Sequence, residues 1–168
     1  GISIYQIRKA LMLGKTSKNA EAKQLIEKAY GNYLADVEKN KDDSSKVLFF
    51  YEALPDVAEY FVDSNQLPKA IEVWENHAKR VQYFLDKNPE DAGFTGYLAD
   101  ANKRIGDIYS GYDEKSKSYK IKDKRRIAKA KIAYQKSIET YEKAYSLYSP
   151  NQGEIRNLQE LQERIRRL

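Results

Sequence analysis

The residues best suited to chemistry are few in this chain. His77 is the only histidine among 168 residues, and there is no cysteine. Metal sites combine several imidazole, thiolate or carboxylate ligands, and both disulfides and thiolate nucleophiles need cysteine. His77 also falls between Trp74 and Ala78 in an apolar pattern, where a packed histidine is the simpler interpretation. We therefore expect no metal site, no disulfide and no cysteine nucleophile.

Two carboxylate pairs, Asp42-Asp43 and Glu90-Asp91, could act as general acid and base. Both stand just before apolar runs, where a helix N-terminus favours anions, so helix capping is the stronger interpretation. The sequence has no Gly-rich phosphate loop, and nothing brings a serine and an aspartate to the histidine as a triad would require. It therefore predicts no catalytic residue, no cofactor and a protein that is not an enzyme.

The positive charge is concentrated in one segment. The formal net charge is +5, but nine bases and three acids between Asp113 and Lys131 give that segment 9 − 3 = +6, and the remainder 5 − 6 = −1. The candidate basic patch is Lys115, Lys117, Lys120, Lys122, Lys124, Arg125 and Arg126. Such a cluster can bind nucleic acid or an anionic surface, or it can be a solvated extension of a helix. Self-association is a third interpretation, in which the segment reaches an acidic surface of another copy.

The elements that position these residues are predicted to be helices throughout. Apolar residues recur at helical spacing over residues 22–37, 47–61, 70–85, 94–112, 127–148 and 155–168, and no alternating pattern competes. A partial first helix is expected within residues 1–18. We therefore predict an all-α fold. With 41% apolar and 33% charged residues the chain suits a globular domain, and no run of about 18 apolar residues could span a membrane.

Prolines and capping residues mark the expected helix boundaries. Asn88 and Ser149 each precede a proline and are predicted to cap the next helix, and the Asp42–Ser45 segment is predicted to cap an earlier one. Pro55 falls inside an apolar run, so we expect a kink or a new helix start near Leu54. The basic segment is expected to be a loop that leads into a helix near Asp123.

Sliding the chain against itself reveals a repeat. At an offset of 48, Ala53 overlies Ala101, and at an offset of 60, Ala70 overlies Ala130 and Trp74 overlies Tyr134. The second offset exceeds the first by 60 − 48 = 12 residues, which indicates an insertion at residues 113–124. The predicted repeat units are about 19–66, 67–126 with the insertion, and 127–168.

This repeat resembles the tetratricopeptide (TPR) family. The pattern is carried by Leu54-x2-Val57-Ala58-x2-Phe61 with Ala70-x3-Trp74, and again by Asn102-x2-Ile105-Gly106-x2-Tyr109 with Ala130-x3-Tyr134. The period of 48 exceeds the 34 residues of that family. With its longer period, the Asn88-Pro89 loop and Ile105-Gly106-Asp107, the chain resembles long-helix repeat modules appended to bacterial signalling proteins, including serine/threonine kinases. Since the chain begins at Gly1 rather than Met, we expect it to be a piece of a longer protein.

The resemblance implies a right-handed α-solenoid that binds a partner in a concave groove. Carried over from the family pattern, the groove residues are Glu52, Glu59, Asp63, Asp100, Lys103 and Asp107. Five of these six are acidic, which would favour a basic or amine-bearing peptide. The alternative is that they form solvated helix faces. We expect a protein-interaction or scaffold module for a peptide or partner protein, with nucleic acid disfavoured and a cytoplasmic location favoured.

Overall fold

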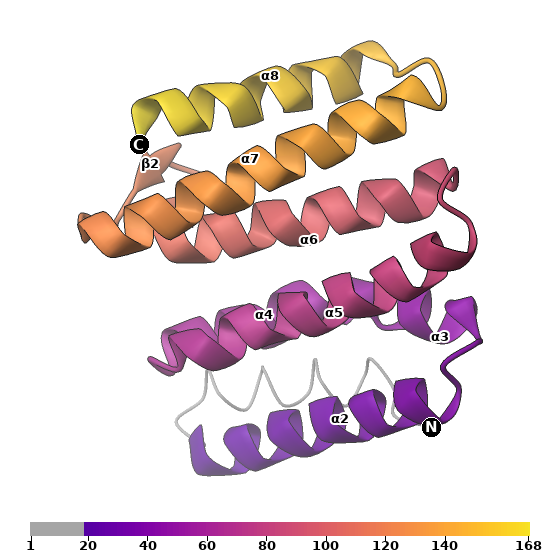
Figure 1. Ribbon diagram of the computed structural model, residues 1–168. Coiled ribbons are helices and arrows are strands. Elements are labelled where there is room, and N and C mark those ends of the chain that lie inside the picture. Colours follow the sequence, from indigo (N-terminus) through magenta and orange to yellow (C-terminus); the bar gives the residue numbers. More distant parts are fainter. Residues whose placement is uncertain (1–18) are drawn as a thin grey trace. The chain divides into compact units, whose positions relative to one another are not determined.

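The computed structural model describes residues 19–168. The predicted partial helix at residues 1–18 lies outside the described residues. The described chain is helical apart from one short β-hairpin, which confirms the prediction of an all-α fold (Figure 1). It divides into two compact units, Gly1–Val73 and Trp74–Leu168, and the boundary falls within helix α5.

The first unit contains α2 (Asn19–Lys39), α3 (Ser44–Phe49), the short 3-10 helix η1 (Tyr51–Ala53), α4 (Leu54–Asp63) and the beginning of α5 (Leu67–Lys87). Its core includes Ile26, Leu54 and Phe61, which are at most 2% exposed. The Tyr33 and Phe50 rings stack with their centroids 4.0 Å apart, which joins α2 to the end of α3.

The two prolines in this unit lie in the first turns of helices. Helix α4 begins at Leu54 with Pro55 in its first turn, after η1 has interrupted the chain, so the predicted restart is confirmed. Pro68 lies in the first turn of α5, where a missing N–H costs little. Asp43 caps α3 by accepting a hydrogen bond from the N–H of Ser45 at 3.0 Å.

The predicted caps Asn88 and Ser149 are wrong by three and two residues, whereas the predicted capping role of the Glu90-Asp91 pair is confirmed for Asp91. Helix α6 is capped by Asp91 rather than Asn88, and α8 by Asn151 rather than Ser149. The Asp91 carboxylate accepts from the N–H of Phe94 at 2.9 Å, and a charged acceptor suits the positive helix N-terminus better than an amide does. Asn151 forms a reciprocal capping box with Glu154.

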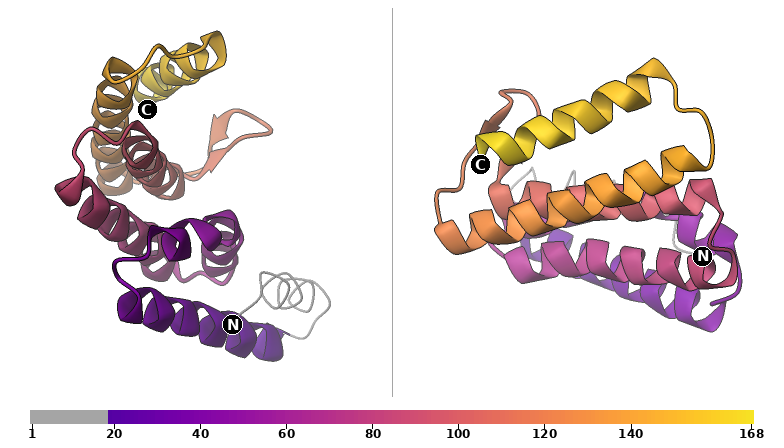
Figure 2. Two further views of the ribbon diagram at one scale, coloured as in Figure 1. Left: turned by 90° about the vertical axis from the view of Figure 1, so that its right-hand side faces the viewer. Right: turned by 45° about the horizontal axis from the view of Figure 1, so that its top comes forward.

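The second unit contains the rest of α5, followed by α6 (Ala92–Ser110), β1 (Tyr112–Asp113), β2 (Ser118–Tyr119), α7 (Lys124–Ser146) and α8 (Gln152–Arg167). Helices α6 and α7 lie side by side, and α8 lies along α7 (Figures 1 and 2). A hydrogen bond of 2.7 Å from the Ser137 hydroxyl to the Ala99 carbonyl also joins α6 to α7.

Gly106 determines how closely α6 and α7 approach. A Cβ atom on this residue would lie 2.5 Å from the ring of Tyr134, which is itself fully buried. Tyr134 belongs to a core cluster with Ala130, Ile138 and Leu161. Gly106 is therefore the small residue that lets these two helices pack closely.

The predicted insertion is a β-hairpin rather than an irregular loop. Strands β1 and β2 pair antiparallel, with Tyr112 opposite Tyr119, and Lys117 takes a left-handed turn conformation at φ 51°. Figures 1 and 2 show this hairpin close to the C-terminal end of α8. Asp123 then caps α7, which confirms the predicted helix start. Among residues 19–168 no helix is both long and apolar enough to cross a bilayer.

A pair of glycine substitutions in α6 tests the close contact. We expect Gly106→Ala to lower the free energy of unfolding by about 1–3 kcal/mol, because the new methyl group overlaps a buried ring. Gly96 is the matched control, since apart from its chain neighbours and the backbone of its own helix no atom lies within 4 Å of the position that a Cβ would take there. We expect Gly96→Ala to raise stability by about 0.5–1 kcal/mol. Chemical denaturation measures both, and equal effects of the two variants would contradict the assignment.

Candidate functional site

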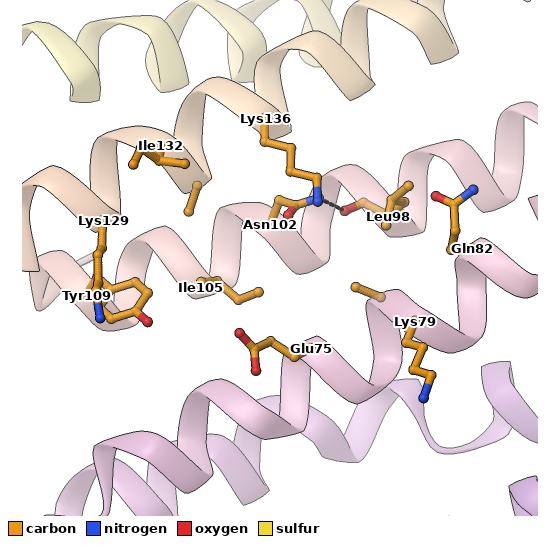
Figure 3. Close-up of a pocket in the computed structure, with 12 residues that line it drawn as sticks. Glu75, Lys79, Gln82, Leu98, Asn102, Ile105, Tyr109, Lys129, Ile132 and Lys136 are labelled. Atoms are coloured by element: carbon orange, nitrogen blue, oxygen red, sulfur yellow. Dashed lines mark hydrogen bonds between the residues drawn. The ribbon is translucent and has the colours of Figure 1, made fainter.

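A groove in the second unit is the best candidate for a binding site. It has a volume of about 530 Å³ and is formed by α5, α6 and α7 (Figure 3). Its lining residues are Glu75, Ala78, Lys79, Gln82, Leu98, Asn102, Ile105, Tyr109, Lys129, Ile132, Ala133 and Lys136. Three helices from one unit therefore supply the whole site.

The two walls are built in the same way. Helix α5 contributes residues 75, 78, 79 and 82, and α7 contributes residues 129, 132, 133 and 136. Both sets have the spacing i, i+3, i+4, i+7, which places their members on one helix face over two turns. Each wall carries an alanine at its middle, Ala78 on α5 and Ala133 on α7.

The floor is mostly apolar and comes from α6. Leu98, Ile105 and Tyr109 contribute apolar surface, and the amide of Asn102 donates to the carbonyl of Leu98 at 2.8 Å. Ile132 on the α7 wall is 70% exposed, although it is a large aliphatic residue. The groove thus combines a partly covered apolar floor with an uncovered apolar side chain.

The charges of the groove are mainly positive. Lys79, Lys129 and Lys136 face a single acid, Glu75. Within residues 19–168 no carboxylate lies within ion-pair distance of these three lysines. The Lys129 ammonium lies 5.4 Å from the centroid of the Tyr109 ring, a cation–π contact.

The six predicted groove residues lie elsewhere and are divided between the two units. Glu52, Glu59 and Asp63 are exposed residues of the first unit. The other three belong to α6 in the second unit: Asp100, Lys103 and Asp107. Because they are offset by about half a turn from Leu98, Asn102 and Ile105, they lie on the face of α6 opposite the groove floor.

The α6 carboxylates on that opposite face already have basic partners. Asp100 pairs with Arg104 at 3.3 Å, and Asp107 pairs with Lys103 at 3.0 Å. Asp107 also accepts from the guanidinium of Arg164 at 2.6 Å. A basic ligand on this part of the predicted surface would have to compete with these internal bases.

Arg164 is the centre of a buried polar network on that face. It is only 5% exposed, and its guanidinium lies 3.7 Å from the centroid of the Tyr112 ring. It contacts Asp107 of α6 and, at 3.0 Å, Glu114 of the hairpin turn. The Tyr134 hydroxyl donates to Asp107 at 2.7 Å. One arginine of α8 therefore ties together α6, the hairpin and, through Asp107, α7.

The environment of this network shifts its pKa values. Burial disfavours the charge on Arg164, but Asp107 and the other nearby anionic groups outweigh that effect and raise the pKa. Burial, followed by the charge of Asp107, raises the pKa of Tyr134 far above its usual value. Tyr134 therefore remains a protonated donor to Asp107 throughout the physiological pH range.

The predicted basic patch is only partly available. Lys117 pairs with Glu114 and Glu160, Lys120 pairs with Asp113 at 3.2 Å, and Arg126 donates to the Ile108 carbonyl at 2.9 Å. The exposed remainder is Lys115, Lys122, Lys124 and Arg125. Of the groove lysines, only Lys129 was counted from the sequence, as part of the basic segment, and Lys79 and Lys136 were missed. Lys129 and Lys136 stand seven residues apart around Ile132, which lies outside the apolar pattern of α7.

His77 is packed inside the second unit, as the sequence predicts. It is 2% exposed and makes edge-to-face contacts with the rings of Trp74 and Tyr97. Burial lowers its pKa to about 4, and the charge of Asp100 partly opposes this shift. Within the described part of the chain no three His, Cys, Asp or Glu residues cluster as metal ligands would.

A double-mutant cycle tests the buried network. We expect Arg164→Ala and Asp107→Ala to couple by about 1–3 kcal/mol in the free energy of unfolding, because each substitution leaves the other partner without its counter-charge. The control pair is Arg167 with Glu163, which lie 3.1 Å apart on the surface of the same helix. That pair should couple by at most about 0.5 kcal/mol. Equal coupling in both cycles would contradict a special role for Arg164.

The pH dependence of stability tests the burial of His77. The pKa of His77 is 6.5 in the unfolded chain and about 4 in the folded protein. The free energy of unfolding should therefore fall as the pH drops through this window, by at most about 1.4 kcal/mol per pH unit. His77→Phe should remove most of the slope between pH 6.5 and 5, because carboxylates titrate mainly below that range. Denaturation at pH 7, 6 and 5 measures it, and an unchanged slope in the variant would rule the explanation out.

Comparisons with protein-family models, with curated proteins and with solved structures gave no match to this chain. The resemblance to tetratricopeptide repeats thus remains a prediction from the sequence.

Proposed function

We propose that this chain is a partner-binding module, and that an acidic segment of another protein with apolar side chains binds in the groove formed by α5, α6 and α7. The observation that carries the proposal is the combination of the exposed Ile132 beside a partly covered apolar floor with three lysines that lack a carboxylate partner among the described residues. A surface of this kind favours a ligand, since Ile132 is 70% exposed and gains from being buried, and the lysines can each take an anionic group.

The groove is large enough to hold a ligand. Its volume of about 530 Å³ lies within the roughly 300–1,000 Å³ typical of ligand sites. The 70% exposure of Ile132 provides a hydrophobic anchor point at the centre of the α7 wall. Interface energies are usually concentrated in such a central apolar contact, with polar groups around it.

The sign of the charge favours an acidic ligand over the basic one expected from the sequence. Three lysines against one glutamate line the groove. On the opposite face of α6, Asp100 and Asp107 already contact Arg104 and Arg164. Complementary potentials bring an anionic segment to the groove and disfavour a cationic one.

The repeat architecture is part of the same proposal. Ala58, Ala70 and Ala130 occupy the small positions of the tetratricopeptide-like pattern and are at most 3% exposed. Gly106, at the fourth such position, contacts a tyrosine ring. Stacked helix pairs of this kind present extended binding surfaces, which would suit a docking module of a larger signalling protein.

A peptide selection against the whole chain tests the proposed function. We expect a random phage-displayed peptide library to yield sequences enriched in Asp or Glu together with Leu, Ile or Phe. Lys129→Glu with Lys136→Glu should weaken binding of the selected peptides by about 10- to 100-fold, as expected for two reversed contact charges.

The matched control is Lys124→Glu with Lys131→Glu. These lysines are exposed, belong to the same helix and are also seven residues apart, but they lie on the opposite face of α7. The control variant should bind the selected peptides as tightly as the unaltered chain.

Equal losses of affinity in both variants, selection of basic peptides or no enrichment would each reject the proposal. Dimers that dissociate in Lys129→Glu/Lys136→Glu alone would also reject it, because the occupant would then be a second copy. Nucleic-acid binding lost in the control variant would instead identify the basic segment as the functional surface.

A further inference from the structure

We infer that the segment bound in this groove is an amphipathic α-helix of about three turns, with two acidic residues spaced seven apart and facing α7. The inference rests on the proposed function and specifies the form of its ligand. It follows from three features of the groove: the state of its backbone groups, the geometry of its walls and the positions of its lysines.

The walls and floor offer almost no backbone partners to an extended peptide. All lining residues belong to α5, α6 or α7, and all but Tyr109, near the end of α6, lie well inside these helices. Their N–H and C=O groups are therefore used within the helices. An extended segment gains affinity from main-chain hydrogen bonds to a sheet edge, and no strand lines this groove. A helix satisfies its own backbone and can enter an apolar groove without leaving polar groups unpaired.

The dimensions of the groove match a short helix. The floor runs from Leu98 to Tyr109, and 11 steps of 1.5 Å give a length of about 16 Å, or three turns. The middle of each wall is an alanine, Ala78 and Ala133, so the walls are lowest where a bound helix would lie closest. Ile132 projects beside this point and can pack between the apolar residues of the incoming helix (Figure 3).

The lysines set the register of the acidic residues. Lys129 and Lys136 are seven residues apart on α7, and Figure 3 shows them along the same wall. They are therefore separated by about 10 Å along the helix axis. Acidic residues at i and i+7 of a bound helix have the same separation on one face, so both can reach a lysine at once. A spacing of five residues would turn the second acid away from α7.

Three synthetic peptides test this inference on the whole chain. Each has the same length, blocked ends and the same composition of Leu, Glu, Ala and Gln. The first places Leu at i, i+3, i+4 and i+7 with two Glu residues seven apart on one flank. The second keeps the Leu pattern but spaces the Glu residues by five. The third alternates Leu with polar residues, as a strand would. Fluorescence anisotropy measures affinity, and amide shift changes around Ile132 locate the site.

We expect the first peptide to bind at least about tenfold more tightly than the second or the third. Its advantage over the second should vanish in Lys129→Glu/Lys136→Glu and persist in Lys124→Glu/Lys131→Glu. Equal binding of the third peptide, still lost in the groove variant, would overturn the helix while leaving the proposed function intact. Binding of the first peptide that is lost only in the control variant would overturn both. Binding of none of the three would overturn the inference, and the library selection would then decide the proposed function separately.

Discussion

The contact between Gly106 and the ring of Tyr134 is the constraint on which the second unit depends. With a Cβ at 2.5 Å from the ring, no other residue at position 106 would allow α6 and α7 to lie so close. Their closeness brings the Tyr134 hydroxyl within 2.7 Å of Asp107 and 3.0 Å of Ser110. It also fixes the α6 floor of the groove against the α7 wall. The absence of a side chain at position 106 thus allows both the polar network on one side of α6 and the candidate binding surface on the other to form.

Much of this fold could be predicted from the sequence, because helices follow from periodicity and their boundaries from local chemistry. The restart at Leu54 and the caps at Asp43 and Asp123 depend only on neighbouring residues. For α6 the sequence predicted both Asn88 and the Glu90-Asp91 pair as caps, and for α8 it predicted Ser149 rather than Asn151, because several polar residues compete within each loop. The hairpin was missed for another reason: its pairing is stabilised by contacts with α8, such as the hydrogen bond from Tyr119 to the Arg164 carbonyl at 3.2 Å. Such contacts join residues far apart in the chain.

The groove could not be predicted in the same way, because it results from residues that fail to pack. Sequence patterns identify apolar residues that a core needs, whereas Ile132 lies outside such a pattern and remains 70% exposed. Its neighbours Lys129 and Lys136 look like ordinary solvated residues until α5 and α6 are placed beside them. The acidic residues of α6 illustrate the converse. Asp107 looks available in the sequence, yet its partner Arg164 lies 57 positions away. Charge counts along a chain thus say little about which charges a ligand can reach.

The single tryptophan gives the second unit a useful optical property. Trp74 is 1% exposed and immediately precedes Glu75, the first residue of the groove on α5. Its indole lies 6.0 Å from the His77 ring and 5.7 Å from the Arg104 guanidinium, measured between centres. Because the chain has no second tryptophan, all of its tryptophan fluorescence comes from Trp74, next to the α5 wall of the groove. Small displacements of α5 can therefore be followed in solution without attaching any dye.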